Sequence, residues 1–155
     1  MYFNNNINDM YDSTIDNGNV IEFSFSLKED NQVYTVFGGQ FKRIDKNKAN
    51  IYIENFESSI KNNGFGKKMI GYAATQILNI IKKHKIDLNI IYGELVIRDK
   101  KYWKNSVHLY EILGACIFGS NSCLKIFSNN LEITLDQLIK ENKGGKFEIT
   151  KFNSK

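Results

Sequence analysis

The stretch NIYIENFESSIKNNGFGKKMIGYAATQILNIIKKHKIDLNIIYGELVI, residues 50–97, decides the fold. Its first segment, Asn50 to Phe56, alternates like a half-buried strand, and its last, Asn89 to Ile97, is apolar enough for a strand buried on both faces. From Gly66 onward, apolar residues recur every three or four positions, which predicts an amphipathic helix of about five turns. Strand, helix and strand in this order form a right-handed crossover, so the two strands are expected to be parallel neighbours.

Two more strands are expected on the amino-terminal side of this stretch. Val20 to Leu27 alternates apolar and polar residues. Val33 to Ile44 reads as a second strand, in which the Gly38-Gly39 pair suggests a bulge or a close backbone approach. Short polar turns join these strands to Asn50–Phe56, which predicts an antiparallel meander. Residues 1–18, which close on Asp16-Asn17-Gly18, are expected to form a mobile arm or one short irregular helix.

The carboxyl-terminal part alternates short helices and strands. A second helix is expected from Asn105 or Ser106 to Leu113, with Gly114 as its terminator. The later elements are short strands at Cys116–Phe118 and Leu124–Phe127, a helix opened by the capping box Thr134-Leu135-Asp136-Gln137, and a final strand from Lys146 to Phe152. Together these patterns predict an α/β (α+β) fold, with a mixed, mostly antiparallel central sheet and flanking helices.

Composition predicts one globular domain over residues 1–155. The chain has 42% hydrophobic and 25% charged residues, a net charge of +4 and two cysteines. No apolar run approaches the roughly 18 residues of a membrane span, and no secretory signal pattern opens the sequence. Neither a zinc site nor a disulfide is expected, so the expected compartment is the cytoplasm. The charge is far weaker than the basic stripe of a dedicated nucleic-acid binder.

The loop from Lys61 to Lys68 (KNNGFGKK) is the candidate binding element. It joins a strand to the amino terminus of the long helix, where unpaired N–H groups and the helix dipole favour a phosphate. Gly64 and Gly66 lack the Cβ that would keep a phosphate from the backbone. The spacing matches neither a dinucleotide fingerprint nor a Walker loop. The alternative is that the two glycines only make a tight strand-to-helix turn.

This loop and the later run Tyr110-Glu111-Ile112-Leu113-Gly114-Ala115 together resemble the GNAT (general N-acetyltransferase) superfamily. In that family an Arg/Gln-x-x-Gly-x-Gly/Ala loop grips the pyrophosphate of acetyl-CoA, and a later helix carries Tyr-Glu-x-Leu-Gly. The resemblance covers about residues 20–118. It implies a sheet splayed between Asn50–Phe56 and Asn89–Ile97, with acetyl-CoA as co-substrate in the opening and no metal. The cofactor-binding residues that it implies are Phe56, Lys61, Asn62, Asn63, Gly64, Phe65, Gly66, Lys67 and Asn105.

Three departures from the family pattern are visible. Lys61 replaces the usual Arg or Gln, which keeps a donor but loses a bidentate fork. Trp103 stands where the family usually has an asparagine, and Asn105 lies two positions later. The usual first strand and helix pair are not recognisable before Val20, so the lid over the acceptor site is expected to be short or built differently.

Acetyl transfer to an amine needs a group that removes the amine proton and a donor for the leaving thiolate. The resemblance makes Tyr110 the acid, although a core tyrosine on the apolar face of its helix is the alternative. Glu54 is the candidate base, because strand alternation places it on one face with Tyr52 and Phe56. Glu94, in the apolar strand, is the second candidate. For both carboxylates the alternative is that they bind a basic substrate or pair with a nearby lysine.

Other reactive residues have simpler interpretations. His108 is expected at a solvated position on its helix, and Cys116 and Cys123 as small buried hydrophobic side chains. Asp99 is expected in a turn.

The expected function is acetyl transfer from acetyl-CoA to a primary amine by direct attack in a ternary complex. The acceptor is a small-molecule or peptide amine, neither a membrane nor nucleic acid is the expected partner, and a homodimer is compatible with the sequence. A non-catalytic acetyl-CoA sensor or interaction module is the alternative. Acetylation of a charged RNA is a third, weaker interpretation of the positive charge.

Overall fold

One eight-stranded sheet carries the whole fold. The computed structural model describes residues 10–29, 32–58, 64–141 and 144–152. Across the sheet the strands follow the order β1-β2-β3-β4-β5-β8-β6-β7. In chain order the elements are β1 (Met10–Asp16), β2 (Val20–Glu29), β3 (Gln32–Arg43), β4 (Lys48–Ser58), α1 (Phe65–His84), β5 (Asp87–Leu95), the 3₁₀ helix η2 (Ile97–Tyr102), α2 (Trp103–Phe118), β6 (Ser122–Ser128), β7 (Leu131–Ile133), α3 (Leu135–Glu141) and β8 (Gly145–Lys151).

The strand directions confirm the predicted fold class. β4 and β5 are parallel, whereas every other neighbouring pair in the sheet is antiparallel. β2, β3 and β4 form the predicted meander, and α1 makes the predicted crossover from β4 to β5. Among the described residues, no helix is long and apolar enough to cross a membrane.

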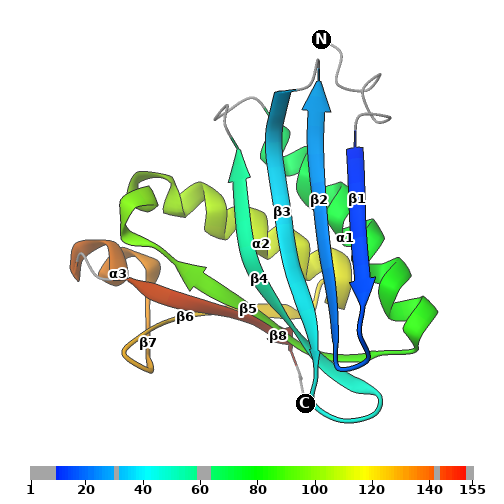
Figure 1. The fold of residues 1–155 in the computed structure, drawn as a ribbon. Helices are drawn as coiled ribbons and strands as arrows, with labels where there is room; N and C mark the ends of the chain where they lie inside the picture. Colours follow the sequence, from blue (N-terminus) through cyan, green and yellow to red (C-terminus); the bar gives the residue numbers. More distant parts are fainter. Residues whose placement is uncertain (1–9, 30–31, 59–63, 142–143, 153–155) are drawn as a thin grey trace.

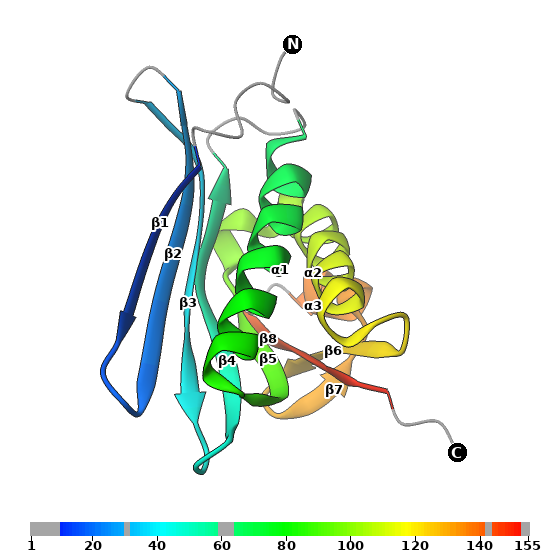
Figure 2. The ribbon, with the colours of Figure 1, turned by 90° about the vertical axis from the view of Figure 1, so that its right-hand side faces the viewer.

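The two long helices cover the same face of the sheet. Figures 1 and 2 show α1 and α2 side by side behind β1–β4, while no helix of the described residues lies on the opposite face of these strands. We call the covered side the helix face and the other the outer face. The helix face holds the core, in which a cluster of phenylalanines on β2 and β3 packs beneath α1. Its rings are those of Phe23, Phe25, Phe37 and Phe41.

Helix α1 follows the predicted apolar period. Met69, Ile70, Ala73, Ala74 and Ile77 are all buried against the sheet. The helix begins after Gly64, whose φ is 77°, and ends in the basic turn Lys82–His84, which complements the negative end of the helix dipole.

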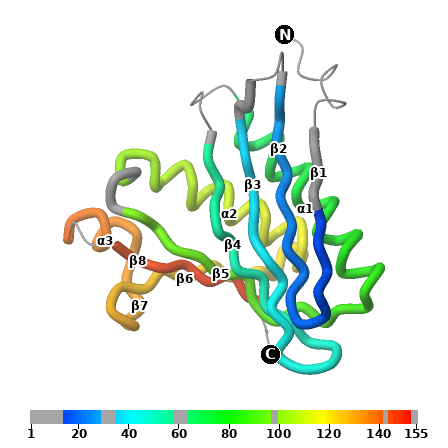
Figure 3. The backbone as a smooth tube through the Cα atoms, in the orientation of Figure 1, coloured from blue at the N-terminus to red at the C-terminus, as the bar shows by residue number. Residues whose placement is uncertain are grey.

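The sheet opens between β4 and β5. Their pairing runs from Lys48–Asp87 to Ile53–Gly93 and stops there, although β4 continues to Ser58. Beyond that point β4 stays paired with β3, and β5 stays paired with β8 to Leu95. The two strands therefore diverge, as Figures 1 and 3 show.

The amino-terminal prediction was wrong for residues 10–16. These residues form β1, which pairs antiparallel with β2 from Met10–Leu27 to Asp16–Ile21. The turn at Asp16–Gly18, expected only to close an arm, makes a hairpin in which Asp16 Oδ1 accepts from the Gly18 N–H. His84 of α1 lies 3.5 Å from Asp16. A polar edge strand lacks the apolar alternation by which strands are recognised. Residues 1–9 lie outside the described residues.

The second helix is longer at both ends than predicted. α2 begins at Trp103 and ends at Phe118, so Cys116–Phe118 is its last turn and not a strand. Gly114 lies inside the helix, where a Cβ would come within 2.6 Å of Ile149 Cγ2. The glycine is there because the helix packs closely on β8, and Gly119, with φ 87°, follows the helix end.

The remaining carboxyl-terminal elements match their predictions, with one addition. The capping box at Thr134 forms, since the Gln137 N–H donates to Thr134 Oγ1 and the Thr134 N–H donates to Gln137 Oε1. The short strand β7 was not predicted.

Burial on both faces of β5 was also a wrong expectation. Ile91 and Leu95 are buried on the helix face, but Glu94 is exposed on the outer face, which no helix covers.

Candidate active site

The opening between β4 and β5 is the natural place for a substrate. Past Ile53 the edge of β4 that faces β5 has no strand partner among the described residues. Backbone N–H and C=O groups on such an edge need other hydrogen-bonding partners, including a ligand. The amino terminus of α1 follows the far end of β4, so it lies at the same end of the opening.

The loop before α1 is described only from Gly64 onward. Gly64 is in the left-handed region, and a Cβ there would meet nothing within 4 Å, so the space beside this backbone is open. The first turn of α1 has no acidic residue, and Lys67 is exposed on it. These features suit an anion at the helix amino terminus. Lys61, Asn62 and Asn63 lie outside the described residues.

Gly66 and Phe65 have packing roles in the structure. A Cβ on Gly66 would lie 3.0 Å from Leu109 Cδ1 of α2 and 3.6 Å from the Phe56 ring, so this glycine lets α1, α2 and β4 meet closely. The Phe65 side chain is buried in the core. Any contact of these two residues with a cofactor would therefore be through the backbone.

Tyr110 lies in an aromatic row beside the opening. Its ring stacks on Phe147 of β8 at 4.1 Å between centroids, and lies 5.9 Å from the ring of Phe56. Phe56 in turn reaches the first turn of α1 at Gly66. The predicted cofactor residues Phe56 and Gly66 and the predicted acid Tyr110 are thus neighbours on the helix face.

Burial governs the chemistry of Tyr110. The side chain is 6% exposed. Desolvation raises the pKa of its hydroxyl above the usual value of 10.0, because the phenolate would lose its hydration. The phenol consequently stays protonated at neutral pH and is available as a donor.

Glu54 does not share a face with Phe56, which corrects the prediction from strand alternation. Gly38 of β3 pairs with Asn55 and Gly39 pairs with Ile53, so Glu54 is the extra residue of a β-bulge. The bulge changes the alternation: Ile53 and Phe56 face the helices, whereas Glu54 is exposed on the outer face. Glu94 is also exposed, on the outer face of β5.

A pair of tyrosines on the outer face was not singled out from the sequence. Tyr52 and Tyr92 are register partners on β4 and β5, with ring centroids 5.2 Å apart. Burial raises the pKa of Tyr52 above its usual value, and so do the nearby charges of Glu94 and Glu54, while Lys42 lowers it. The signal was present in the sequence, since Tyr-x-Glu occurs at both 52–54 and 92–94.

Trp103, which stands where the resembled motif has an asparagine, has a structural role. It is 1% exposed, and its indole N–H donates to the Val96 carbonyl at 2.6 Å. It thereby holds the start of α2 against the end of β5. Asn105, on the first turn of α2, is exposed.

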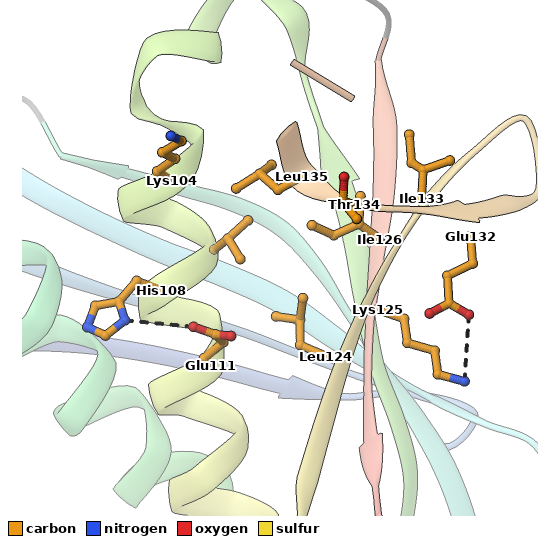
Figure 4. A pocket seen from close by; sticks show the side chains of 11 residues that line it. Lys104, His108, Glu111, Leu124, Lys125, Ile126, Glu132, Ile133, Thr134 and Leu135 are labelled. Carbon is orange, nitrogen blue, oxygen red and sulfur yellow. Dashed lines mark ion pairs between the residues drawn. The ribbon is translucent and has the colours of Figure 1, made fainter. Parts of the chain in front are cut away.

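His108 is on the surface, as the sequence predicts. It lies 3.7 Å from Glu111, one turn further along α2. Both residues line a separate cavity of about 390 Å³ between α2 and the β6–β7 hairpin. Figure 4 shows its aliphatic floor, including Leu124 and Ile126, and a second ion pair between Lys125 and Glu132 on the far wall. The predicted acetyl-CoA residues do not line this cavity.

The cysteines do not match their prediction fully. Cys116 is exposed, because it lies on the last turn of α2, and Cys123 is half-buried. Asp99 lies in η2, not in a turn, and its side chain is outside what the structure describes. Among the described residues, no group of three or more His, Cys, Asp or Glu side chains could hold a metal ion.

No protein-family model and no curated protein matches the chain. Solved structures do match it. An IAA acetyltransferase from Bacillus cereus is 13% identical over 84% of this chain and 78% of its own, with a TM-score of 0.48. A GNAT family acetyltransferase from Elizabethkingia anophelis with acetyl-CoA bound is 9% identical over 93% and 99%, at 0.44. A spermidine N-acetyltransferase chimera from Vibrio cholerae and a human enzyme is 15% identical over 87% and 69%, at 0.44.

The strand topology is the one that the sequence motifs imply. The sheet is mixed and mostly antiparallel, its two parallel strands are joined by the helix that follows the glycine loop, and it opens at their carboxyl ends. By this topology the chain has a GNAT-like fold.

Proposed function

We propose that this protein is an acetyl-CoA-dependent N-acetyltransferase that acts on a primary amine. One observation carries the proposal: the candidate groups for the two substrates lie on opposite faces of the sheet at a single opening. Gly64, Phe56 and Tyr110 lie on the helix face, and Glu54 and Glu94 on the outer face. Such an arrangement suits direct transfer in a ternary complex, since each substrate can enter from its own side.

The residues present fit acetyl-CoA. The open space at Gly64, the acid-free first turn of α1 and the exposed Lys67 suit the pyrophosphate, together with Lys61, Asn62 and Asn63. When bound, acetyl-CoA supplies a thioester whose carbonyl carbon accepts the amine nitrogen. Backbone N–H groups of β4 past Ile53 are the candidate donors to the carbonyl oxygen as it becomes negative.

A carboxylate on the outer face transfers a proton, and Tyr110 on the helix face donates a hydrogen bond. Glu54 or Glu94, directly or through water, takes the proton that the ammonium must lose before attack. The N–C bond forms as the C–S bond breaks, and Tyr110 donates a hydrogen bond to the departing sulfur. As the amide forms, the nitrogen gives up its second proton to solvent, and the thiolate takes a proton from solvent as it leaves.

A second candidate function is acetyl-CoA binding without transfer. Two observations favour it: Trp103 is a core residue in the place of the family's asparagine, and the Tyr110 ring is packed like a core tyrosine. In such a sensor the helix-face site would be intact and the outer-face carboxylates would have no catalytic role.

Two measurements test the function. Calorimetry with acetyl-CoA measures binding, and release of free CoA thiol across a panel of amines measures transfer. Thiol release that depends on an amine supports the enzyme, whereas saturable binding with no amine-dependent release in the whole panel supports the sensor. Failure to bind acetyl-CoA would overturn both.

The loop has a matched control within the chain. Gly64 and Gly119 both have positive φ, 77° and 87°, and a Cβ at either would meet nothing within 4 Å. Gly64→Val and Gly119→Val both introduce backbone strain, and the strain is greater at Gly119, whose ψ is −174° compared with 1° at Gly64, but only Gly64 lies at the proposed phosphate site. We expect Gly64→Val to weaken acetyl-CoA binding more than tenfold and Gly119→Val to leave it unchanged. Equal affinities in folded proteins would remove the loop from the site.

A further inference from the structure

The two strands that border the opening carry the same tripeptide in register. Tyr52-Ile53-Glu54 on β4 runs beside Tyr92-Gly93-Glu94 on β5, and Ile53–Gly93 is their last pair. Because the strands are parallel, both tyrosines lie on the outer face just before the opening. The two glutamates follow at its two sides, and both are exposed.

The charges around these residues are mostly negative. Glu54 and Glu94 make no ion pair with any described residue, and both act on the Tyr52 hydroxyl, whose pKa is raised by burial and by these carboxylates. One cation already lies here: Lys42 Nζ is 4.7 Å from the centroid of the Tyr52 ring. An ammonium group is thus accommodated on this ring.

A hollow extends from Glu54 across the outer face towards β2. It has a volume of about 220 Å³ and is lined by Glu22, Ser24, Gly38, Glu54, Asn55 and neighbouring residues. It exists because β3 presents Gly38 on the outer face at this point, between Ser24 of β2 and Asn55 of β4, so no β3 side chain fills the space there. Its charged lining residues, Glu22 and Glu54, are both acidic, and the exposed Ile15 adds an apolar wall.

The hollow on the other side of the opening has a different charge. It is larger, about 570 Å³, and its lining includes Glu94 together with Lys146, which is the register partner of Glu94 on β8. The positive charge of Lys146 repels a cationic ligand in this hollow. A cationic group of a bound molecule is therefore favoured on the Glu22–Glu54 side.

The reaction itself says which nitrogen these carboxylates can hold. The amine that attacks the thioester must be neutral when it reacts, so it has no positive charge with which to pair with a carboxylate during the reaction. Charge binding at the outer face requires a second nitrogen that stays protonated. Glu22 and Glu54 lie on strands about 10 Å apart, and because Glu22 is in register with Gln40 and Tyr52, Glu54 is also offset by two residues along β4. Both line the one hollow, so an ammonium within it can interact with both, directly or through water.

We propose that the acceptor is an aliphatic diamine or polyamine, whose reacting amine enters the opening beside Tyr52 and Tyr92 while a second ammonium binds between Glu22 and Glu54. This inference rests on the proposed function and assigns Glu22 and the two tyrosines a part in specificity. The methylene chain between the two nitrogens crosses β3 beside Gln40, which lies in register between Glu22 and Tyr52, and packs on the tyrosine rings.

The test compares monoamines with diamines of matched chain length. We expect kcat/KM, from release of free CoA thiol, to be at least tenfold higher for the diamine, with the preference falling as salt is added. Glu22→Gln should lower the diamine preference at least tenfold by raising the diamine KM. Glu141→Gln, on α3 and exposed, removes the same charge far from the hollow and should keep the preference.

Lys42→Met is expected to change the diamine KM in the opposite direction. It removes the cation that competes for the Tyr52 ring, so the diamine KM should fall, whereas a structural role for Lys42 would raise it or reduce stability. Melting temperatures of all variants separate loss of specificity from loss of folding.

The two proposals fail in distinguishable ways. If amines are acetylated but diamines show no preference, and Glu22→Gln changes nothing, this inference is wrong and the proposed function stands. If calorimetry in the presence of CoA shows diamine binding that Glu22→Gln weakens, but no amine is acetylated, the site stands and the transfer function is wrong. Absence of both binding and turnover would overturn both.

Discussion

Tyr110 has to meet two requirements with one side chain. Its ring stacks on Phe147 within the core, and its hydroxyl is the proposed donor to the leaving sulfur. A thiol has a pKa of about 8.5, below the usual value of a phenol and further below that of a phenol raised by burial. The proton therefore stays on the Tyr110 oxygen, and the residue acts as a hydrogen-bond donor that keeps its proton.

Replacing the hydroxyl alone tests this role. Tyr110→Phe keeps the stack on Phe147 and should lower kcat about 10²-fold, with acetyl-CoA affinity unchanged, because the donor acts only as the sulfur leaves. The measurements are kcat with a working amine and calorimetry with acetyl-CoA. A lower melting temperature with full specific activity would instead assign Tyr110 to the core alone.

The raised pKa of Tyr110 also predicts how stability depends on pH. Unfolding returns the hydroxyl to its ordinary pKa near 10.0, so above that pH the unfolded chain binds fewer protons than the folded one. The stability present below pH 10 is then lost as pH rises, by about 1.4 kcal/mol per pH unit until the folded group also ionises.

Tyr110→Phe removes this one contribution while the lysines titrate as before. Between about pH 9 and pH 11, chemical unfolding should therefore show the variant gaining stability relative to the parent protein. A constant difference across this range would mean that the hydroxyl is solvated in the folded state.

The residues of the candidate site were predictable in part. The loop predicted a helix start at Gly64, and the resemblance of the Tyr-Glu-x-Leu-Gly run to the family motif singled out Tyr110; the structure describes Gly64 at the start of α1 and Tyr110 on α2, and their proposed roles stay predictions. The position of Glu54 was not predictable, because one bulged residue reverses the alternation on which the prediction rested, and only pairing with Gly38–Gly39 creates that bulge. The roles proposed for Glu54 and Glu94 stay predictions.

At the scale of elements, Gly114 shows why α2 was predicted too short. A glycine near the end of an apolar period usually marks a helix terminus. Here it lies inside α2, since its missing side chain lets the helix approach Ile149 and Ser122. Close packing between two elements distant in sequence has no local signature. The long period of α1 and the capping box of α3 are local features, and both were predicted correctly.

Alanine at two helical glycines should have opposite effects. Gly114→Ala gains helix propensity of about 1 kcal/mol but forces a methyl group to within 2.6 Å of Ile149 Cγ2, so we expect a net loss of about 1–2 kcal/mol. Gly71→Ala on α1 meets nothing within 4 Å and should stabilise by about 0.5–1 kcal/mol. Denaturant unfolding measures both. Stabilisation by Gly114→Ala would show that α2 does not pack so closely on β8.

For the whole molecule, the opening is a consequence of how the sheet is assembled. β4 belongs to the meander β2–β3–β4 and β5 to the group β5–β8–β6, and only Lys48–Ile53 joins β4 to its parallel neighbour. The Gly38-Gly39 pair of β3 lies opposite the bulge at Glu54 and beside the hollow. The sequence predicted the parallel pair, but the point of divergence depends on pairing with β3 and β8 and was not visible in it.

If the two substrates enter from opposite faces, changes on the two faces should act independently. Gly64→Val on the helix face should reduce acetyl-CoA binding, and Glu54→Gln on the outer face should reduce acceptor binding, with no residue shared between them. Separated sites of this kind combine additively within about 0.5 kcal/mol. The losses in rate measured with both substrates below their KM should therefore multiply in the double variant to within about twofold. Four proteins assayed with one diamine complete the cycle. A double variant no slower than the slower single variant would mean that both changes collapse the same site, and that the two substrates do not approach from separate faces.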